Sequence, residues 1–167
     1  MATELEDLKI LQNAEEIADA VWKRVVQWDE FAKDVVGKQM ARATDSIGAN
    51  IAESYGRYNF GEKLQFLYYS RGSLFEAKYW LNRALARELM NAGEVIAYVT
   101  RLSDVASQLN TFANSLKSQR KDAKTQPKTV RESSAEYVFE SLPDNSMPLF
   151  TDIELNWLTA LPTVSSL

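Results

Sequence analysis

The prolines of this chain are confined to its C-terminal part, and this restricts the fold more than any other feature. The first of the four prolines is Pro127, so residues 1–126 contain none, while all six glycines lie before residue 94. Proline is excluded from helix interiors, and a long stretch without it and with sparse glycine favours a helical domain. The 167 residues are enough for one such domain and a shorter appendage.

Hydrophobic residues recur every three or four positions through the proline-free part. This periodicity predicts four helices, at about residues 4–28, 31–56, 61–91 and 94–120. Residues 91–93, Asn-Ala-Gly, are a helix-stop signal at the end of the third. Short connections between long helices are typical of an antiparallel up-down-up-down bundle. We therefore predict an all-α fold, with a four-helix bundle over residues 1–120. Gly37 and Gly48 lie inside the second helix, and we expect close packing against a neighbouring helix to offset their low helix propensity.

The third predicted helix is apolar over more of its surface than one core requires. Besides a stripe of leucines, it carries a neighbouring stripe formed by Tyr68, Phe75 and Tyr79. An apolar stripe about 100° wide is enough to face one core. We expect this helix to be central or buried on two sides, and the second side could contact another subunit.

Residues 121–167 are predicted to form a flexible tail, because charge and proline are distributed differently there. Residues 132–167 hold six acidic residues and no basic one. Just before them lies a run of six basic residues, which form a candidate nucleic-acid contact: Lys117, Arg120, Lys121, Lys124, Lys128 and Arg131. A basic linker followed by an acidic, proline-punctuated arm is typical of flexible segments.

A short helix is predicted near residues 151–161 of the tail. Thr151 and Glu154 have the spacing of a capping box, in which each side chain caps the other's main chain. Five apolar residues are the candidate anchors of this segment: Phe150, Ile153, Trp157, Leu158 and Leu161. Such a helix is marginal alone, so it packs on its own bundle or docks on a protein partner.

The chain has neither cysteine nor histidine, and its net charge is −4. These absences exclude disulfide frameworks, thiolate zinc sites, histidine metal sites and catalytic triads. We expect no catalytic residues, no metal and no cofactor. The acidic amino-terminal segment argues against a signal peptide, and no apolar run reaches the ~18 residues of a membrane span. We therefore expect a cytoplasmic protein that does not contact a membrane.

Polar residues spaced by three or four positions mark one face of the second predicted helix: Ser46, Asn50, Glu53 and Arg57. We favour a polar seam between helices, which would fix their register. Catalysis by Glu53 and Arg57 is the alternative, but a general base needs reach and a tuned pKa.

Two stretches carry a family resemblance. The run from Ser46 to Arg57, SIGANIAESYGR, resembles the signature S-I-P-S-N-I-A-E-G-x-G-R of small bacterial four-helix bundle proteins encoded in intervening sequences of 23S ribosomal RNA genes. Residues 66–76, FLYYSRGSLFE, are similar to the family's F-L-x-x-A-x-G-S-L-x-E. The matching positions are Ser46, Asn50, Glu53, Gly56, Arg57, Gly72, Ser73, Leu74 and Glu76. Gly48, Ala49 and Ser54 depart from the signature, and the resemblance covers about residues 8–118.

The resemblance implies a ring-like homopentamer without enzymatic activity. It also extends to accessory proteins of diversity-generating retroelements, which bind RNA and a reverse transcriptase. Our leading hypothesis is a non-catalytic homo-oligomeric scaffold or adaptor that docks a protein partner through its C-terminal tail. The alternative is an RNA-binding accessory subunit, for example of a reverse transcriptase complex, that uses the basic run and the basic residues of the third helix. An enzyme that uses Glu53 and Arg57 is the third.

Overall fold

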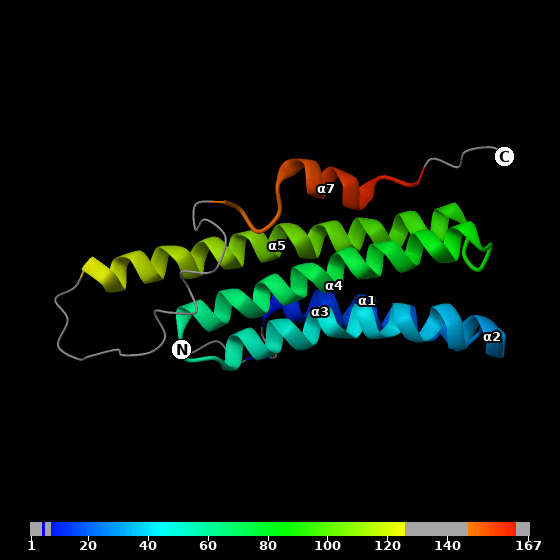
Figure 1. Cartoon of the computed structure of the whole chain (residues 1–167), viewed down its shortest axis with the longest axis horizontal. Helices are drawn as coiled ribbons and strands as arrows, with labels where there is room; N and C mark the ends of the chain where they lie inside the picture. The colour runs from blue at the N-terminus through cyan, green and yellow to red at the C-terminus, as the bar shows by residue number, and fades with distance from the viewer. Residues whose placement is uncertain (1–4, 6–7, 126–146, 163–167) are drawn as a thin grey trace.

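The computed structural model describes residue 5, residues 8–125 and residues 147–162, and every regular element there is helical (Figure 1). The all-α prediction is thus confirmed for these residues. The long helices are α1 (Lys9–Val25), α3 (Lys38–Gly56), α4 (Phe60–Ala86) and α5 (Ala92–Thr125). The shorter ones are α2 (Glu30–Ala32), the π-helix η2 (Lys33–Gly37) and α7 (Asp152–Thr159). Among the described helices, none combines the length and apolarity that crossing a bilayer requires.

The four long helices lie lengthwise beside one another and enclose one hydrophobic core (Figure 1). Helix α3 packs against α1 and α4, and α5 packs against α4 and α1. Each long helix contributes fully buried residues to the core, among them Val21, Met40, Ile47, Leu67, Leu102 and Leu109. The core therefore runs along the axis of all four helices, as the predicted periodicity requires.

The second predicted helix corresponds to α2, η2 and α3, which follow one another without a break. Asp29 caps its start, because its carboxylate accepts a hydrogen bond of 2.9 Å from the main-chain N–H three residues on. A Cβ atom on Gly37 would lie 2.5 Å from Val25 Cγ1, so the expected close packing is confirmed there. At Gly48 the nearest atom, Leu11 Cδ1, would lie at an ordinary 3.6 Å. Only Gly37 is thus required by the packing of its helix.

Helix α4 ends earlier than predicted and by a different device. We expected residues 91–93 to stop it, but its last residue is Ala86, and Glu88 takes a left-handed conformation with φ 58°. The N–H groups of Glu88 and Leu89 donate to the carbonyls of Leu85 (3.0 Å) and Ala84 (2.9 Å). These two bonds form a Schellman motif, which usually has glycine at the left-handed position.

Asn91 begins α5 instead of ending α4. Its Oδ1 accepts from the N–H of Glu94 at 2.9 Å, and the Glu94 carboxylate accepts from the N–H of Asn91 at 2.8 Å. Asparagine is favoured both after a helix and before one, and here the capping role prevails. The predicted stop signal was therefore wrong in kind, although it lay close to the true connection.

The last turns of α5 carry most of the basic run. The helix ends at Thr125, five residues later than predicted. Four members of the run are thus on a helix rather than in a linker: Lys117, Arg120, Lys121 and Lys124. The other two, Lys128 and Arg131, lie outside the described residues.

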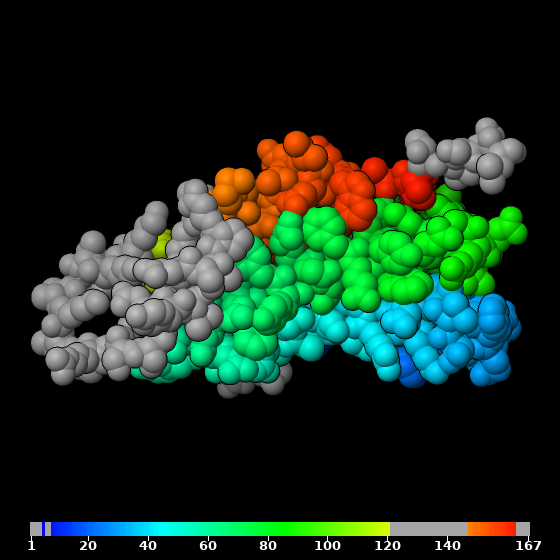
Figure 2. All heavy atoms as spheres, viewed as in Figure 1, coloured from blue at the N-terminus to red at the C-terminus, as the bar shows by residue number. Residues whose placement is uncertain are grey.

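The second apolar side of α4 is covered by the chain itself. Residues 147–162, which we call the C-terminal segment, lie over α4 and α5, and α7 is their helical part (Figures 1 and 2). Leu149, Phe150 and Leu158 of this segment are buried. Helix α4 is thus buried toward the core and in part toward this segment of its own chain, whereas Tyr79 of its second stripe stays 53% exposed.

Candidate peptide-docking surface

The C-terminal segment begins with the irregular residues 147–150 and becomes helical after Thr151, the N-cap of α7. The predicted capping box is present: the N–H of Thr151 donates to Glu154 Oε2 at 2.9 Å, and the N–H of Glu154 donates to Thr151 Oγ1 at 3.3 Å. The helix covers Asp152–Thr159, inside the predicted 151–161. Local chemistry therefore determines where the segment becomes helical.

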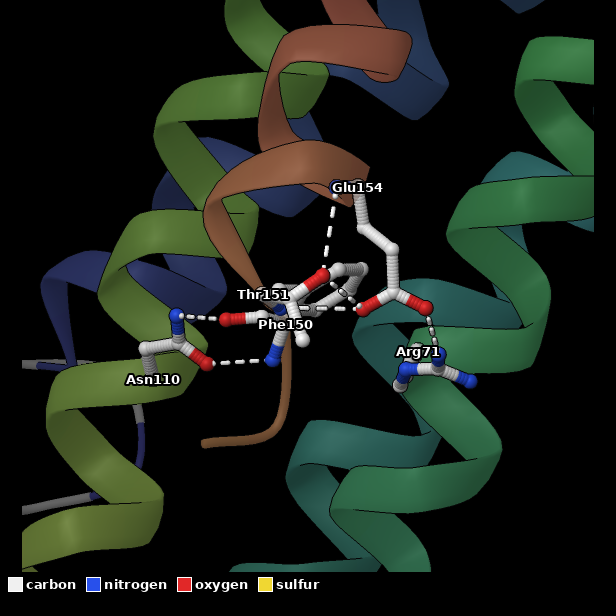
Figure 3. A network of polar contacts seen from close by, with 5 residues as sticks. All are labelled: Arg71, Asn110, Phe150, Thr151 and Glu154. Atoms are coloured by element: carbon white, nitrogen blue, oxygen red, sulfur yellow. Dashed lines mark hydrogen bonds and ion pairs between the residues drawn. The ribbon is translucent and has the colours of Figure 1, made fainter. Parts of the chain in front are cut away.

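Asn110 of α5 bonds the main chain of the irregular residues that precede α7. Its Nδ2 donates to the carbonyl of Phe150 at 2.8 Å, and its Oδ1 accepts from the N–H of Phe150 at 2.6 Å (Figure 3). Seven residues further along α5, Lys117 Nζ donates to the carbonyl of Met147 at 2.6 Å. A side-chain amide that bonds both polar groups of one residue fixes the register of a peptide. Sequence reasoning missed Asn110, which is a polar residue beside the inward-facing Leu109 and Ala113.

Phe75 of α4 lies between two aromatic rings of the segment. Its ring stacks on Phe150, with centroids 5.8 Å apart and planes inclined by 15°. It also stacks on Trp157 at 5.3 Å and 23°. Aromatic pairs in this range add about 0.5–1.5 kcal/mol to the burial of their area. Phe75, one residue of the second apolar stripe of α4, thus forms the aromatic floor of the docking surface.

Arg71 of α4 joins the charged and aromatic contacts. Its guanidinium forms an ion pair with Glu154 (Figure 3). The same guanidinium lies 4.8 Å from the ring centroid of Phe75. Burial raises the pKa of the Glu154 carboxyl, but the hydrogen bonds from Thr151 and the charge of Arg71 outweigh it, so the net pKa lies below its ordinary value. The ionised carboxylate is therefore the form that the docked segment favours.

Lys78 lies one turn beyond Phe75 and is 1% exposed. Its ammonium donates to the carbonyl of Ala160, at the C-terminal end of α7, and lies 5.9 Å from the ring centroid of Trp157. Burial lowers the pKa of this lysine. Carbonyl oxygens at a helix C-terminus carry partial negative charge, which suits a cation. A buried lysine in the apolar pattern of α4 was a signal for this contact that the sequence reasoning did not use.

The five predicted anchors separate into two groups. Phe150 and Leu158 are buried in the fold of their own chain, and Leu161 is half-buried against it. Ile153 is 81% exposed and Trp157 is 43% exposed. In this structure Phe150 and Leu158 anchor the segment on its own bundle, and a role of these two residues toward a partner stays a prediction. Of the two alternatives for the predicted helix, the structure contains the one in which it packs on its own bundle.

Three matching residues of the family resemblance, Ser46, Asn50 and Ser73, lie along the contact between α3 and α4. Asn50 Nδ2 donates to the carbonyl of Ser46 at 2.7 Å and approaches Ser73 Oγ at 3.5 Å. Ser70 and Ser54, which sequence reasoning did not assign, donate to main-chain carbonyls across the same contact, at 3.0 and 2.8 Å. These bonds between the two helices agree with the favoured interpretation of a polar seam.

The other signature residues lie outside this seam. Glu53 and Arg57 form an ion pair with each other on the surface, at 47% and 40% side-chain exposure. Arg57 also lies 4.6 Å from the ring centroid of Phe66. Gly56, Gly72 and Glu76 are exposed, and a Cβ atom on either glycine would meet nothing within 4 Å. The structure therefore does not bring the nine matching residues together into one site.

Comparison with known proteins and protein families bears on the long helices of the chain. A search of curated proteins found no match to the chain. A model of the family described as "23S rRNA-intervening sequence protein" matches residues 6–111, which include α1 to α4 and α5 as far as Thr111. The match ends before the C-terminal segment, so this segment is a feature that the family model does not describe. With well over half of its length matched, the chain belongs to the 23S rRNA-intervening sequence protein family.

Proposed function

We propose that this protein is a non-catalytic scaffold or adaptor that assembles as a homo-oligomer and docks a protein partner through its C-terminal segment. In this proposal, the long helices form an antiparallel four-helix bundle, and the ring-like pentamer implied by the family resemblance repeats the segment around the assembly. Repetition of a docking element raises avidity without any new contact.

The two-sided character of α7 carries the proposal. Its inner side anchors it through the fully buried Leu158 and through the Trp157 ring that stacks on Phe75, while Ile153 remains 81% exposed on the outer side of the docked helix. A capped, anchored helix that holds a large apolar side chain in solvent is already ordered before it meets a partner. Exposed apolar anchors of this kind dominate binding energy in protein interfaces.

The absence of catalysis is part of the same proposal. Glu53 and Arg57 neutralise each other on an exposed surface. A general base is usually tuned by burial or by an unbalanced charge, and this pair has neither. Together with the lack of cysteine and histidine, this supports a binding role rather than a chemical one.

The test compares Ile153→Asp with a matched control, Asn156→Asp, because both positions are exposed on α7 and gain the same charge. Sedimentation equilibrium is expected to give a multiple of the single-chain mass for the wild type and both variants. Affinity capture followed by quantitative mass spectrometry is expected to lose a reproducible partner with Ile153→Asp only. A monomeric wild type, or a partner that both variants retain equally, contradicts the proposal.

A second candidate function is RNA binding at the projecting end of α5. This end extends past the neighbouring helices and lies on the same side of the molecule as the α3–α4 connection (Figure 1). That connection holds Tyr58, which is 92% exposed. Basic side chains that follow the backbone and exposed aromatic rings that stack on bases are the two parts of a single-strand binding surface.

Filter binding of a single-stranded RNA across a salt series tests this second candidate. Four phosphate contacts predict a slope of roughly −3 in a plot of log affinity against log salt, at about −0.7 per contact. The double variant Lys121→Glu and Lys124→Glu is expected to flatten the slope. No retention of RNA at low ionic strength would exclude this function.

A further inference from the structure

We propose that the docking surface of α4 and α5 is a receptor for an acidic, amphipathic peptide of another protein, and that the C-terminal segment is its built-in competitor. This rests on the proposed protein-docking function but concerns the inner side of the segment, whereas the docking argued above uses its outer side. The surface is defined by five residues: Arg71, Phe75, Lys78, Asn110 and Lys117.

The polar contacts of the surface go mainly to groups that every peptide has. Asn110, Lys117 and Lys78 bond main-chain atoms of the segment. Only Arg71 contacts a side-chain carboxylate, that of Glu154. The surface therefore recognises the main chain of a bound peptide and one negatively charged side chain, rather than one particular sequence.

The apolar contacts add a spacing requirement. The Phe75 ring stacks on the ring of Phe150, just before the helix, and on the ring of Trp157 in the helix, seven residues later. Leu158 then fills the core beside them. A ligand of this surface accordingly needs an aromatic residue and a glutamate four positions later. It also needs an aromatic residue seven positions after the first one, followed directly by a leucine.

Charge favours an acidic ligand. Three cations of the surface, Arg71, Lys78 and Lys117, each contact an oxygen atom of the segment. Lys78 is buried by the docked segment, with a main-chain carbonyl as its acceptor. Opposite charges steer association and select the partner. The C-terminal arm matches this, since residues 132–167 hold six acidic residues and no basic one.

The connection to α5 makes the segment a competitor. It consists of residues 126–146, which span up to about 70 Å when extended. The first docked contact lies only about 12 Å back along α5, at Lys117. A tethered ligand competes at an effective concentration that the reach of its connection sets. A peptide from another protein binds in proportion to the released fraction, so the segment sets the affinity that a partner must exceed.

The test measures fluorescence anisotropy of a labelled synthetic peptide, residues 147–162, titrated with full-length chains. The variant Leu158→Asp releases the tethered segment and leaves the surface unchanged, and Glu154→Arg is a milder second release variant. Both are expected to bind the probe at least tenfold more tightly than the wild type. Adding Arg71→Glu is expected to weaken binding tenfold, and a peptide with Glu154→Arg is expected to restore it.

Three results would overturn the inference. The first is that neither release variant binds the probe more tightly than the wild type. The second is that Arg71→Glu leaves the affinity unchanged and the charge-reversed peptide gains nothing. The third concerns competition for the labelled probe bound to a release variant. Full-length Arg71→Glu chains, which still carry an intact segment, would displace the probe at a tenfold lower concentration than unlabelled free peptide does. In that case the occupant is a second copy. A peptide with Ile153→Asp should bind like the original, so this test can fail independently of the outer-face test.

Discussion

The two sides of α4 are held by different chemistry. Toward α3, the bonds are neutral: buried Ser70 donates to the carbonyl of Ile47, and Asn50 approaches Ser73. Toward the C-terminal segment, they are charged, with Arg71 on Glu154 and Lys78 on a carbonyl. Neutral buried bonds need no counter-charge, whereas a buried cation is stable only while its partner stays. The α3 side thus suits a permanent contact and the segment side a reversible one.

The largest effect expected from this comparison is on the core that both sides share. Leu74 of α4 is fully buried, and Leu74→Ala is expected to lower the free energy of unfolding by about 2–5 kcal/mol. Urea denaturation followed by circular dichroism measures this change. The exposed Ala86, changed to Gly at the end of the same helix, is the control and should lower it by less than ~1 kcal/mol.

The second-largest expected effect is local release of the C-terminal segment from a bundle that stays folded. Leu158→Ala removes a fully buried anchor of α7, and a cavity there costs about 2–5 kcal/mol, enough to release the segment locally. The main unfolding transition should stay where it is in the wild type. Release exposes Lys78, so a water-soluble amine-reactive reagent should modify this lysine many times faster than in the wild type, as measured by mass spectrometry.

Lys33 is the control for that labelling experiment, because it lies far from the segment in the chain and pairs with Glu30 on the surface. Its rate should not change. Equal protection of Lys78 in the wild type and Leu158→Ala would mean that the segment and the bundle form one cooperative unit. The proposed difference between the two sides of α4 would then fail.

Acid is expected to release the segment before it disturbs the α3 side. The docked state lowers the pKa of Glu154 below its ordinary value of 4.5, so this carboxylate stabilises docking above pH 4.5. The contribution is lost as the pH falls through the lower pKa of the docked state. In two-dimensional NMR spectra, the amide signals of Phe150 and Thr151 should shift in this window.

The variant Glu154→Gln provides the comparison for the acid experiment. Its docking should be weaker at neutral pH and insensitive to pH in the same window. Glu94 also has a lowered pKa, through its hydrogen bonds from Asn91 and Arg24, and it remains in both proteins. A change that persists in Glu154→Gln therefore belongs to the bundle and would contradict a role for Glu154.

A feature could be predicted from the sequence when the residues that determine it are close together in the chain. The capping box of Thr151 and Glu154 depends on residues three positions apart, and it was predicted correctly. The end of α4 depends on a left-handed Glu88, for which the sequence carries no glycine signal, and it was missed. Asn91 is compatible with either end of a helix, and only the Glu94 contact decides between them.

The docking surface lay beyond local reasoning for the same reason. Arg71 and Glu154 are 83 positions apart, and Asn110 and Phe150 are 40 apart. The amphipathic pattern of residues 151–161 revealed that the segment must bind something, and the wide apolar surface of α4 revealed that something must cover it. Matching the two required the fold, because periodicity gives the face of a helix and not its neighbour.

The smallest predicted effect tests whether the α3 side is as permanent as its neutral bonds suggest. Ser70→Ala removes a buried hydrogen bond of 3.0 Å to the carbonyl of Ile47, and such a bond contributes about 0.5–1.5 kcal/mol. Ser107→Ala is the matched control, since that exposed hydroxyl bonds a carbonyl of its own helix. Urea denaturation should show the loss in Ser70→Ala only, and the reactivity of Lys78 should stay at the wild-type level in both. If Ser70→Ala also exposed Lys78, the two sides of α4 would be coupled through the helix, and the segment could report on the α3 contact instead of acting independently of it.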